Sequence, residues 1–479
     1  GNAGFGNGGL QGANINTSWG TSHIYLRKYI SFESLKTEDL DNLRIQVFHD
    51  EDCEIYINGV LAAKLDGFSN RYVFTEISEK AKQTIKLRGD NLLAVSCINT
   101  VGNQFIDLGF ILTNIPLESL AYTPNDADVA FDAFHNQFFD EEKQIYHSKS
   151  DKTGIAAIWT QAIYWDMAIN AYSRTKSDKY KKRVDSIYAG NKNHYAQFDW
   201  DNGKVWFIYD DIMWWIISLA RAYEKYEDKA EYLELAMSGF DRVWNGSPIV
   251  KDPGSYDPKK GGMYWQWIQS NPPNRPENDG KMACINYPTV IAAMHLYNAT
   301  QDKSYLDKAK EIYMWSRKNL FNVNNGMVAD SKHGEGEPHW KSQLYNQGTC
   351  IGAAVMLYKE TQEITYLNDA LLSADYVKNT TSTRDGILPF RTGIEQGIYV
   401  AIFAQYVAEL IKELNEVDAS IYLDWLDYNI NTGWSNRVSN ITDRNFKKAR
   451  YLRDIEVYDA SGIPALMQVV SSIKSNYKK

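Results

Sequence analysis

The stretch LYNATQDKSYL (residues 296–306) recurs in altered form as LYKETQEITYL (residues 357–367). In both copies one helix-like run ends and the next begins within the repeated stretch. A looser copy pairs Ala222-Tyr223 with Tyr232-Leu233. Because self-similarity at helix junctions is typical of repeated supersecondary units, the sequence predicts that pairs of helices have been duplicated.

Helical periodicity covers the chain after a proline-containing segment near residue 120. Helices are predicted near residues 126–140, 156–173, 176–196, 210–226, 228–245, 281–299, 302–320, 342–360, 363–379, 393–414, 418–430 and 458–476. Segments 210–226 and 342–360 are mostly apolar, whereas 228–245 and 302–320 carry one apolar stripe, which predicts an inner and an outer layer. Six such pairs predict an (α/α)6 toroid over residues 120–479. An open solenoid is the alternative, but it would need polar capping repeats that the sequence does not show.

The first part of the chain has a different period. Apolar and polar residues alternate in short runs from Ile24 to Leu112. The pair Asn58-Gly59 lies between two apolar runs and predicts a tight hairpin, because both central residues of that turn need positive φ. We therefore expect a β-sandwich over residues 1–116. Residues 49–60 and 89–95 resemble the jelly-roll, galactose-binding-like domains attached to many bacterial glycan-active enzymes, which leaves both a spacer role and a weak carbohydrate-binding role open.

Composition narrows the class of partner. The chain has 479 residues, of which 44% are hydrophobic, so sizeable cores in two domains are expected. Its 51 basic and 60 acidic residues give a net charge of −9 without any Lys/Arg run, which argues against nucleic acid and favours a neutral substrate. No apolar stretch is long enough to cross a bilayer, and residues 1–6 lack a signal pattern, so we expect a mature or trimmed form.

Four cysteines, Cys53, Cys97, Cys284 and Cys350, are scattered along the chain. They are too few for a disulfide framework, and no CxxC spacing indicates a metal site. We expect buried thiols, with a Cys53–Cys97 disulfide as the alternative.

Two adjacent carboxylates begin a run that is typical of a buried helix, in YDDIMWW (residues 209–215). On a helix, neighbouring side chains diverge by about 100°, so Asp210 and Asp211 can converge on one ligand only in a non-helical turn before the helix. In such a turn a carboxyl separation of roughly 5 Å is attainable, which suits retaining glycoside hydrolysis. Helix capping is the alternative explanation for the pair taken alone.

Two loop regions are expected to frame a site with this pair. Residues 261–267 precede a helix start at 281–286, and residues 326–330 precede His339-Trp340 and a helix start at 344–349. Their glycines permit close backbone approach, their Asn and Gln side chains match hydroxyl groups, and their aromatic rings can stack on sugars. The set suits a polyol, whereas packing is the alternative for any single aromatic residue.

The order of these motifs resembles glycoside hydrolase family 76, the endo-α-1,6-mannanase family, over residues 120–476. The resemblance rests on Tyr209-Asp210-Asp211 with Trp214-Trp215, Gly261-Gly262 with Trp265, Lys281 with Ala283 and Asn286, Gly326 with Val328 and Asp330, and Tyr345-Asn346-Gln347-Gly348. It implies an (α/α)6 fold, retention of anomeric configuration and α-1,6-mannan backbones as substrate. Residues 395–401 depart from the family's pattern, since the glycine is kept but the basic residues are absent.

Site residues follow from the same resemblance. It implies Asp210 as the nucleophile and Asp211 as the acid/base. The expected substrate-binding residues are Tyr209, Trp214, Tyr264, Trp265, Asn286, Asp330, Tyr345, Asn346 and Gln347. Two carboxylates in one enclosed site give a metal-free mechanism, because one keeps its proton while the other stays charged, and we expect no cofactor.

The expected function is therefore endo-acting hydrolysis of α-1,6-mannan or manno-oligosaccharides. The alternatives are another (α/α)6 glycan-active enzyme and a surface glycan-binding protein without catalysis. We expect a monomer that binds no nucleic acid, has no transmembrane segment and is exported by a bacterium to the periplasm, the cell surface or the medium.

Overall fold

The computed structural model describes residues 4–8, 13–33, 35–69, 72–100, 102–112, 122–227, 229–266, 280–390, 395–447 and 455–477. These residues form two compact units, one consisting mainly of the chain before residue 113 and the other mainly of the chain after residue 121. The domain boundary that the sequence predicts, between residues 116 and 120, lies outside the described residues.

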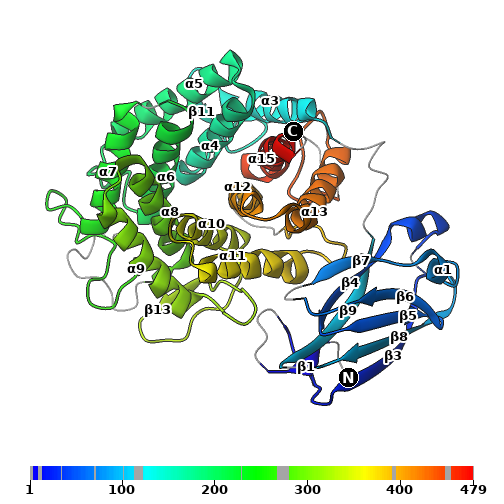
Figure 1. Cartoon of the computed structure of the whole chain (residues 1–479). Coiled ribbons are helices and arrows are strands. Elements are labelled where there is room, and N and C mark those ends of the chain that lie inside the picture. The colour runs from blue at the N-terminus through cyan, green and yellow to red at the C-terminus, as the bar shows by residue number, and fades with distance from the viewer. Residues whose placement is uncertain are drawn as a thin grey trace. The chain divides into compact units, whose positions relative to one another are not determined.

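The first unit contains two β-sheets (Figure 1). Its strands are β1 (Phe5–Asn7), β2 (Thr17–Ser18), β3 (His23–Ser31), β4 (Leu43–Asp50), β5 (Cys53–Ile57), β6 (Val60–Leu65), β7 (Val73–Glu76), β8 (Asp90–Ile98) and β9 (Gln104–Leu112). The sheet orders are β2-β1-β9-β4-β7 and β3-β8-β5-β6. Alternate residues of both sheets, such as Ile45 and Val47 of β4 and Ile55 and Ile57 of β5, share one buried core. The predicted sandwich is confirmed.

The predicted hairpin is also confirmed. Asn58 and Gly59 connect β5 to β6 with φ angles of 49° and 84°, the left-handed values that this two-residue turn requires. On the neighbouring pair of strands, Cys53 of β5 lies directly opposite Cys97 of β8, and both are buried free thiols.

The second unit is built from paired helices (Figure 1). The inner helices are α4 (Ile158–Thr175), α6 (Tyr209–Lys225), α8 (Ala283–Thr300), α10 (Leu344–Thr361), α12 (Tyr399–Lys412) and α15 (Gly462–Tyr477). The outer helices are α3 (Pro124–Phe138), α5 (Asp178–His194), α7 (Ala230–Asn245), α9 (Lys303–Leu320), α11 (Ile364–Tyr376) and α13 (Glu416–Ser435). Each inner helix packs on the next, and α15 packs on α4 to close the ring. The predicted (α/α)6 toroid is confirmed.

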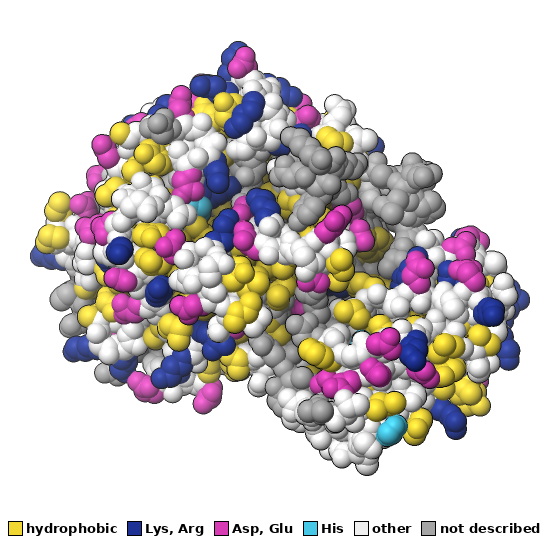
Figure 2. All heavy atoms as spheres, viewed as in Figure 1, with side chains coloured by type: hydrophobic (Ala, Val, Ile, Leu, Met, Phe, Trp, Pro, Cys, Tyr) yellow, Lys and Arg dark blue, Asp and Glu magenta, His cyan; other side chains and the backbone are white. Residues whose placement is uncertain are grey.

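Burial separates the two layers as the apolar pattern predicts. Every residue of α8 from Ala283 to Leu296 is buried. By contrast, α9 buries mainly one stripe, which consists of Ala309, Ile312, Tyr313, Ser316 and Leu320. On the face drawn in Figure 2, acidic and basic side chains are interspersed. In the part of the chain that the structure describes, no helix is both long and apolar enough to cross a membrane.

The inner helices run parallel to one another. Near their starts, the Trp215 side chain of α6 donates to the Ile158 carbonyl of α4 at 3.0 Å. Near their ends, Arg221 of α6 donates to Asn170 of α4 at 2.9 Å. The starts of α10 and α12 likewise meet, since the ring centroids of Tyr345 and Tyr399 lie 4.3 Å apart. The N-terminal ends of these helices therefore gather at one rim of the toroid, which we call the N-terminal rim.

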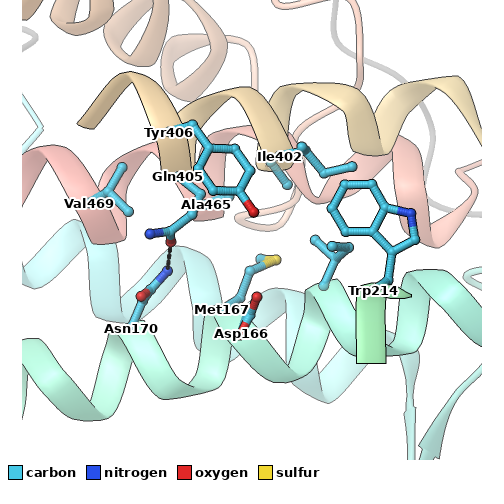
Figure 3. Close-up of a pocket in the computed structure, with 11 residues that line it drawn as sticks. Asp166, Met167, Asn170, Trp214, Ile402, Gln405, Tyr406, Ala465 and Val469 are labelled. Atoms are coloured by element: carbon cyan, nitrogen blue, oxygen red, sulfur yellow. Dashed lines mark hydrogen bonds between the residues drawn. The ribbon is translucent and has the colours of Figure 1, made fainter. Parts of the chain in front are cut away.

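A buried polar network crosses the middle of the toroid. Arg221 of α6 pairs with Asp166 of α4 at 2.6 Å, and Asn170 of α4 donates to Gln405 of α12 at 2.7 Å. Asp166, Asn170 and Gln405 border a narrow cavity, with Trp214 at its other end (Figure 3). The network ties α4, α6 and α12 together inside the ring.

Removing the cation of this network should destabilise the toroid strongly. In Arg221→Met the Asp166 carboxylate keeps its burial but loses its counter-ion, so we expect unfolding to become easier by about 3–5 kcal/mol. Urea unfolding followed by tryptophan fluorescence measures this change. The double variant Asp166→Leu/Arg221→Met should recover much of the loss, and equal midpoints for the single and double variants would contradict the assignment.

Candidate active site

The Asp210–Asp211 pair lies in the first turn of α6, which begins at Tyr209. The expectation that the pair would precede the helix is therefore wrong. The N-cap is Ile208, which has extended backbone angles and no side-chain capping bond, so neither aspartate is the N-cap of α6. Asp210 and Asp211 are each half-buried as residues.

The glycine-rich loop is fixed beside this turn by backbone pairing. Ile208 and Gln266 form a bridge, and the Tyr209 N–H donates to the Trp265 carbonyl at 3.0 Å. Gly262 has a φ of 77°, and a side chain there would run into the Trp315 ring, which explains why glycine occupies this position. The loop thus brings Trp265 to the first turn of α6.

Asn286 of α8 is hydrogen-bonded to the backbone of the same loop. Its side chain accepts from the Met263 N–H at 2.8 Å and donates to the carbonyls of Met263 and Met282 at 3.0 and 2.8 Å. Lys281 stabilises the loop further, because its ammonium group donates to Asp257 at 2.7 Å and to the Gly261 carbonyl at 2.6 Å. Buried amide and ammonium groups therefore hold the loop in place.

Several neighbours donate hydrogen bonds to Asp210, but burial outweighs them. Burial raises the pKa of Asp210, and hydrogen bonds from the Cys284 thiol, the Trp265 side chain and the first backbone N–H groups of α6 lower it, so that the pKa is raised to about 7. One of its oxygens, Oδ1, is buried without a hydrogen-bond partner among the described residues. A ligand or a water molecule can supply that partner.

The environment of Asp211 is less favourable to its charged form. Burial raises the pKa of Asp211 well above the ordinary range, and the negative charges of Asp210 and Glu395 raise it further. Among the described residues, no hydrogen-bond donor lowers the pKa of Asp211, whereas several lower that of Asp210. Asp210 therefore ionises first, and Asp211 keeps its proton to higher pH.

Several of the residues expected to bind a substrate belong instead to the buried framework. Tyr209 is fully buried and donates to Asp252. Asn286 clamps the loop, and Gln347 accepts from the Val328 N–H at 2.5 Å and donates to Ser373 at 2.9 Å. A substrate can reach these three side chains only after a rearrangement, so we assign them a positioning role.

Trp214 and Asn346 lie in the floor of the site. Trp214 is only 2% exposed, and its ring packs 6.0 Å from that of Trp159. Asn346 is fully buried at the start of α10, and both polar atoms of its side chain lack a hydrogen-bond partner in the described ranges. Both side chains are therefore closed to solvent in this structure.

The remaining predicted residues stay partly accessible: Tyr264, Trp265, Asp330 and Tyr345. Tyr264 donates to Asp257 at 2.9 Å, and Asp330 is anchored through its backbone to Ala283 and His339 at 2.9 Å each. Trp267, also part of the predicted loop, lies outside the described residues.

Sequence reasoning missed two residues that the fold brings to the pair. The Cys284 thiol at the start of α8 is hydrogen-bonded to Asp210 and Tyr345, and the charge of Asp330 also acts on it. Cys284 therefore connects the starts of α6, α8 and α10. Glu395, just before α12, acts on Asp211. Both residues lie in segments that the sequence singles out, 281–286 and 395–401, but nothing in either segment distinguishes Cys284 or Glu395 from its neighbours. Within the described ranges, no group of three or more His, Cys, Asp or Glu side chains could hold a metal ion.

Comparison with known proteins gives a family and a fold. The model of glycosyl hydrolase family 76 matches residues 123–478. An α-1,6-mannanase structure from Salegentibacter sp. HEL1_6 is similar, with a TM-score of 0.63, 24% identity and coverage of 73% of this chain and 98% of that chain. No curated protein sequence matches the chain.

Two further structures are informative. An inactive variant of the Salegentibacter enzyme, in which two consecutive aspartates are replaced by asparagine, is in complex with α-1,6-mannotriose; its TM-score is 0.64 at 22% identity, covering 73% of this chain and 99% of that chain. A family 76 glycoside hydrolase from a bovine Bacteroides thetaiotaomicron strain has a TM-score of 0.59 at 16% identity and covers 96% of this chain and 97% of that chain. Identities this low establish the fold alone.

The raised pKa of Asp211 predicts a pH-dependent gain of stability in Asp211→Asn. The folded state of the wild type binds more protons than the unfolded state above the unfolded pKa of 3.8, so its stability falls as the pH rises. Asparagine removes that penalty. We expect the melting temperature of the variant to exceed that of the wild type by about 2 °C or more at pH 8 and by less at pH 4.

Thermal melts at several pH values measure this difference. The matched control is Asp307→Asn on the exposed side of α9, which should show no such trend. A stability difference for Asp211→Asn that does not change with pH would contradict the assigned environment.

Proposed function

The chain belongs to glycosyl hydrolase family 76, and from that premise we propose that it is a retaining glycoside hydrolase that cleaves α-1,6-mannosidic linkages within mannan backbones. The observation that carries the proposal is the pair of enclosed, adjacent carboxylates, of which Asp210 receives hydrogen bonds and Asp211 is repelled by two neighbouring charges. The inactive Salegentibacter variant, changed at two consecutive aspartates and bound to α-1,6-mannotriose, supports it.

In the first step Asp210 acts as the nucleophile and Asp211 as the acid. The Asp210 carboxylate bonds to the anomeric carbon, and the bond from that carbon to O6 of the departing sugar breaks. Asp211 gives its proton to the departing O6. The environments match these roles, because donors around Asp210 favour its charged form and repulsion around Asp211 favours its neutral form.

In the second step the roles of Asp211 reverse. As a carboxylate it takes a proton from water, the water oxygen bonds to the anomeric carbon, and the bond to Asp210 breaks. Two inversions give net retention. Neighbouring side chains in the first turn of α6 diverge by about 100°, but the charge of Asp210 acts on Asp211, so the two carboxylates lie near each other. The proposed retention rests on the resemblance to family 76.

The charge of the site fits a neutral glycan. The acidic side chains at the site are those of Asp210, Asp211, Asp330 and Glu395. The ammonium group of Lys281 is paired with Asp257. An anionic sugar would be repelled by the acids. Trp265 and Tyr345 offer partly accessible rings for a sugar face.

We further propose export to the periplasm, the cell surface or the medium, because a polymeric glycan reaches an enzyme there. The β-sandwich serves as a spacer or as a weak carbohydrate-binding module, and the protein acts as a monomer. Of these proposals, export follows from the substrate class.

Replacement of either aspartate should abolish turnover without unfolding the protein. We expect Asp210→Asn and Asp211→Asn each to lower kcat on linear α-1,6-mannan by about 10³-fold or more, since each removes a group that the transition state needs. Release of reducing ends measures the rate, and proton NMR identifies the anomer formed first, which should be α.

Asp307→Asn is the control and should keep wild-type turnover. Near-normal activity of either active-site variant would remove that residue from the mechanism, and β anomer as the first product would exclude retention. Binding of mannan without any release of reducing ends by the wild type would favour a glycan-binding protein instead.

A further inference from the structure

A third carboxylate stands at the N-terminal rim together with the Asp210–Asp211 pair. Glu395 precedes the short helix η4 (Gln396–Ile398), which leads directly into α12. Its Oε2 accepts a hydrogen bond of 2.8 Å from the indole N–H of Trp159, which lies in the first turn of α4. One polar contact therefore joins the starts of two inner helices beside the site.

The backbone of Glu395 is held in an unusual conformation. Its φ is 65°, in the left-handed region that residues other than glycine seldom adopt. The Glu395 N–H is hydrogen-bonded to the Tyr458 hydroxyl, and Gly397 packs against Asp459 so closely that a Cβ would not fit. Asp459 is itself paired with Arg444 at 2.6 Å. Such strain persists only where the surroundings impose it, and here they fix the direction of the carboxylate.

Ring packing brings this carboxylate to the start of α6. Trp159, the partner of Glu395, lies 6.0 Å from the ring of Trp214, which is three residues and thus nearly one turn beyond Asp211. Burial and then the charges of Asp210 and Glu395 raise the pKa of Asp211. Burial also raises the pKa of Glu395, whereas the Trp159 hydrogen bond lowers it.

The other titratable neighbours do not cancel the repulsion between the Glu395 and Asp211 carboxylates. Asp210 faces Asp211 from the same helix, and Tyr195 approaches it from the end of α5. Tyr164 of α4 and Tyr458 of α14 (Val457–Ala460) lie near Glu395. Among the described residues, no Lys, Arg or His contributes to the shifts of Asp211 or Glu395.

We propose that Glu395 is a positioning residue whose carboxylate, held by Trp159 at the N-terminal rim, keeps Asp211 in the protonated form that donates to the departing sugar. This role rests on the proposed hydrolytic function. Glu395 transfers no proton and forms no bond to the substrate. Its charge favours protonated Asp211 before the first step and makes ionised Asp211 a stronger base toward water in the second.

The decline of kcat at alkaline pH tests this role, because the proposed first step needs protonated Asp211 and stops when Asp211 loses its proton. In Glu395→Gln the Trp159 hydrogen bond keeps an oxygen acceptor, but the negative charge is gone. We expect the alkaline limb of the kcat profile on linear α-1,6-mannan to move about one pH unit toward acid, which is about a tenfold loss of rate on that side. The rate at low pH should change little.

Glu395→Asp is the matched control, because it keeps the charge and should leave the alkaline limb close to that of the wild type. A merely structural role would lower the rate equally at every pH. An unchanged limb in Glu395→Gln, or the same shift in both variants, would overturn the proposal.

A second readout does not depend on any substrate. Infrared difference spectra against Asp211→Asn follow the carboxyl band of Asp211 with pH in the wild type and in Glu395→Gln. The band should titrate at lower pH when Glu395 is replaced. If it does so and the wild type does not cleave mannan, the hydrolytic proposal fails and only the effect of the Glu395 charge on Asp211 stands. If mannan is cleaved and the titration does not move, the role of Glu395 fails.

Discussion

The parallel packing of the inner helices is the constraint on which the rest of this protein depends. Because the starts of α4, α6, α8, α10 and α12 gather at one rim, short segments from distant parts of the sequence meet there. The first backbone N–H groups of α6 point toward the same place and favour negative charge. Asp210, Asp211 and Glu395 accordingly lie at this rim, and the buried Arg221–Asp166 pair ties the helices together below it.

Enclosure of like charges at this rim opposes folding, and the same enclosure produces reactivity. In water both aspartates would be charged at neutral pH and equivalent in role. Inside the toroid, donors collect around Asp210 and repulsion acts on Asp211, so two chemically identical side chains become a nucleophile and an acid in the proposed mechanism. The large apolar core formed by the inner helices offsets the electrostatic penalty.

Some residues in the loops of the site hold the backbone in place, and others remain accessible to a ligand. Asn286, Gln347 and Lys281 use their polar groups to hold backbone, which leaves Trp265, Asp330 and Tyr345 at the accessible side. A motif of polar and aromatic residues therefore marks where a site is built, but not which of its members a ligand touches. That distinction depends on the direction of each side chain.

Local pattern alone determined the two-part architecture of this protein, since the hairpin at Asn58-Gly59, the repeat at residues 296–306 and 357–367, and the apolar character of inner helices are each encoded within a few consecutive residues. It also marked Asp210 and Asp211. Only the tertiary structure decided that the pair lies within the first turn of α6, that Tyr209 and Asn286 face the framework, and that Cys284, Trp159 and Glu395 join the site. The reason is physical: burial, charge repulsion and ring packing depend on distances between helices that closure of the ring brings together, and no spacing along the chain records those distances.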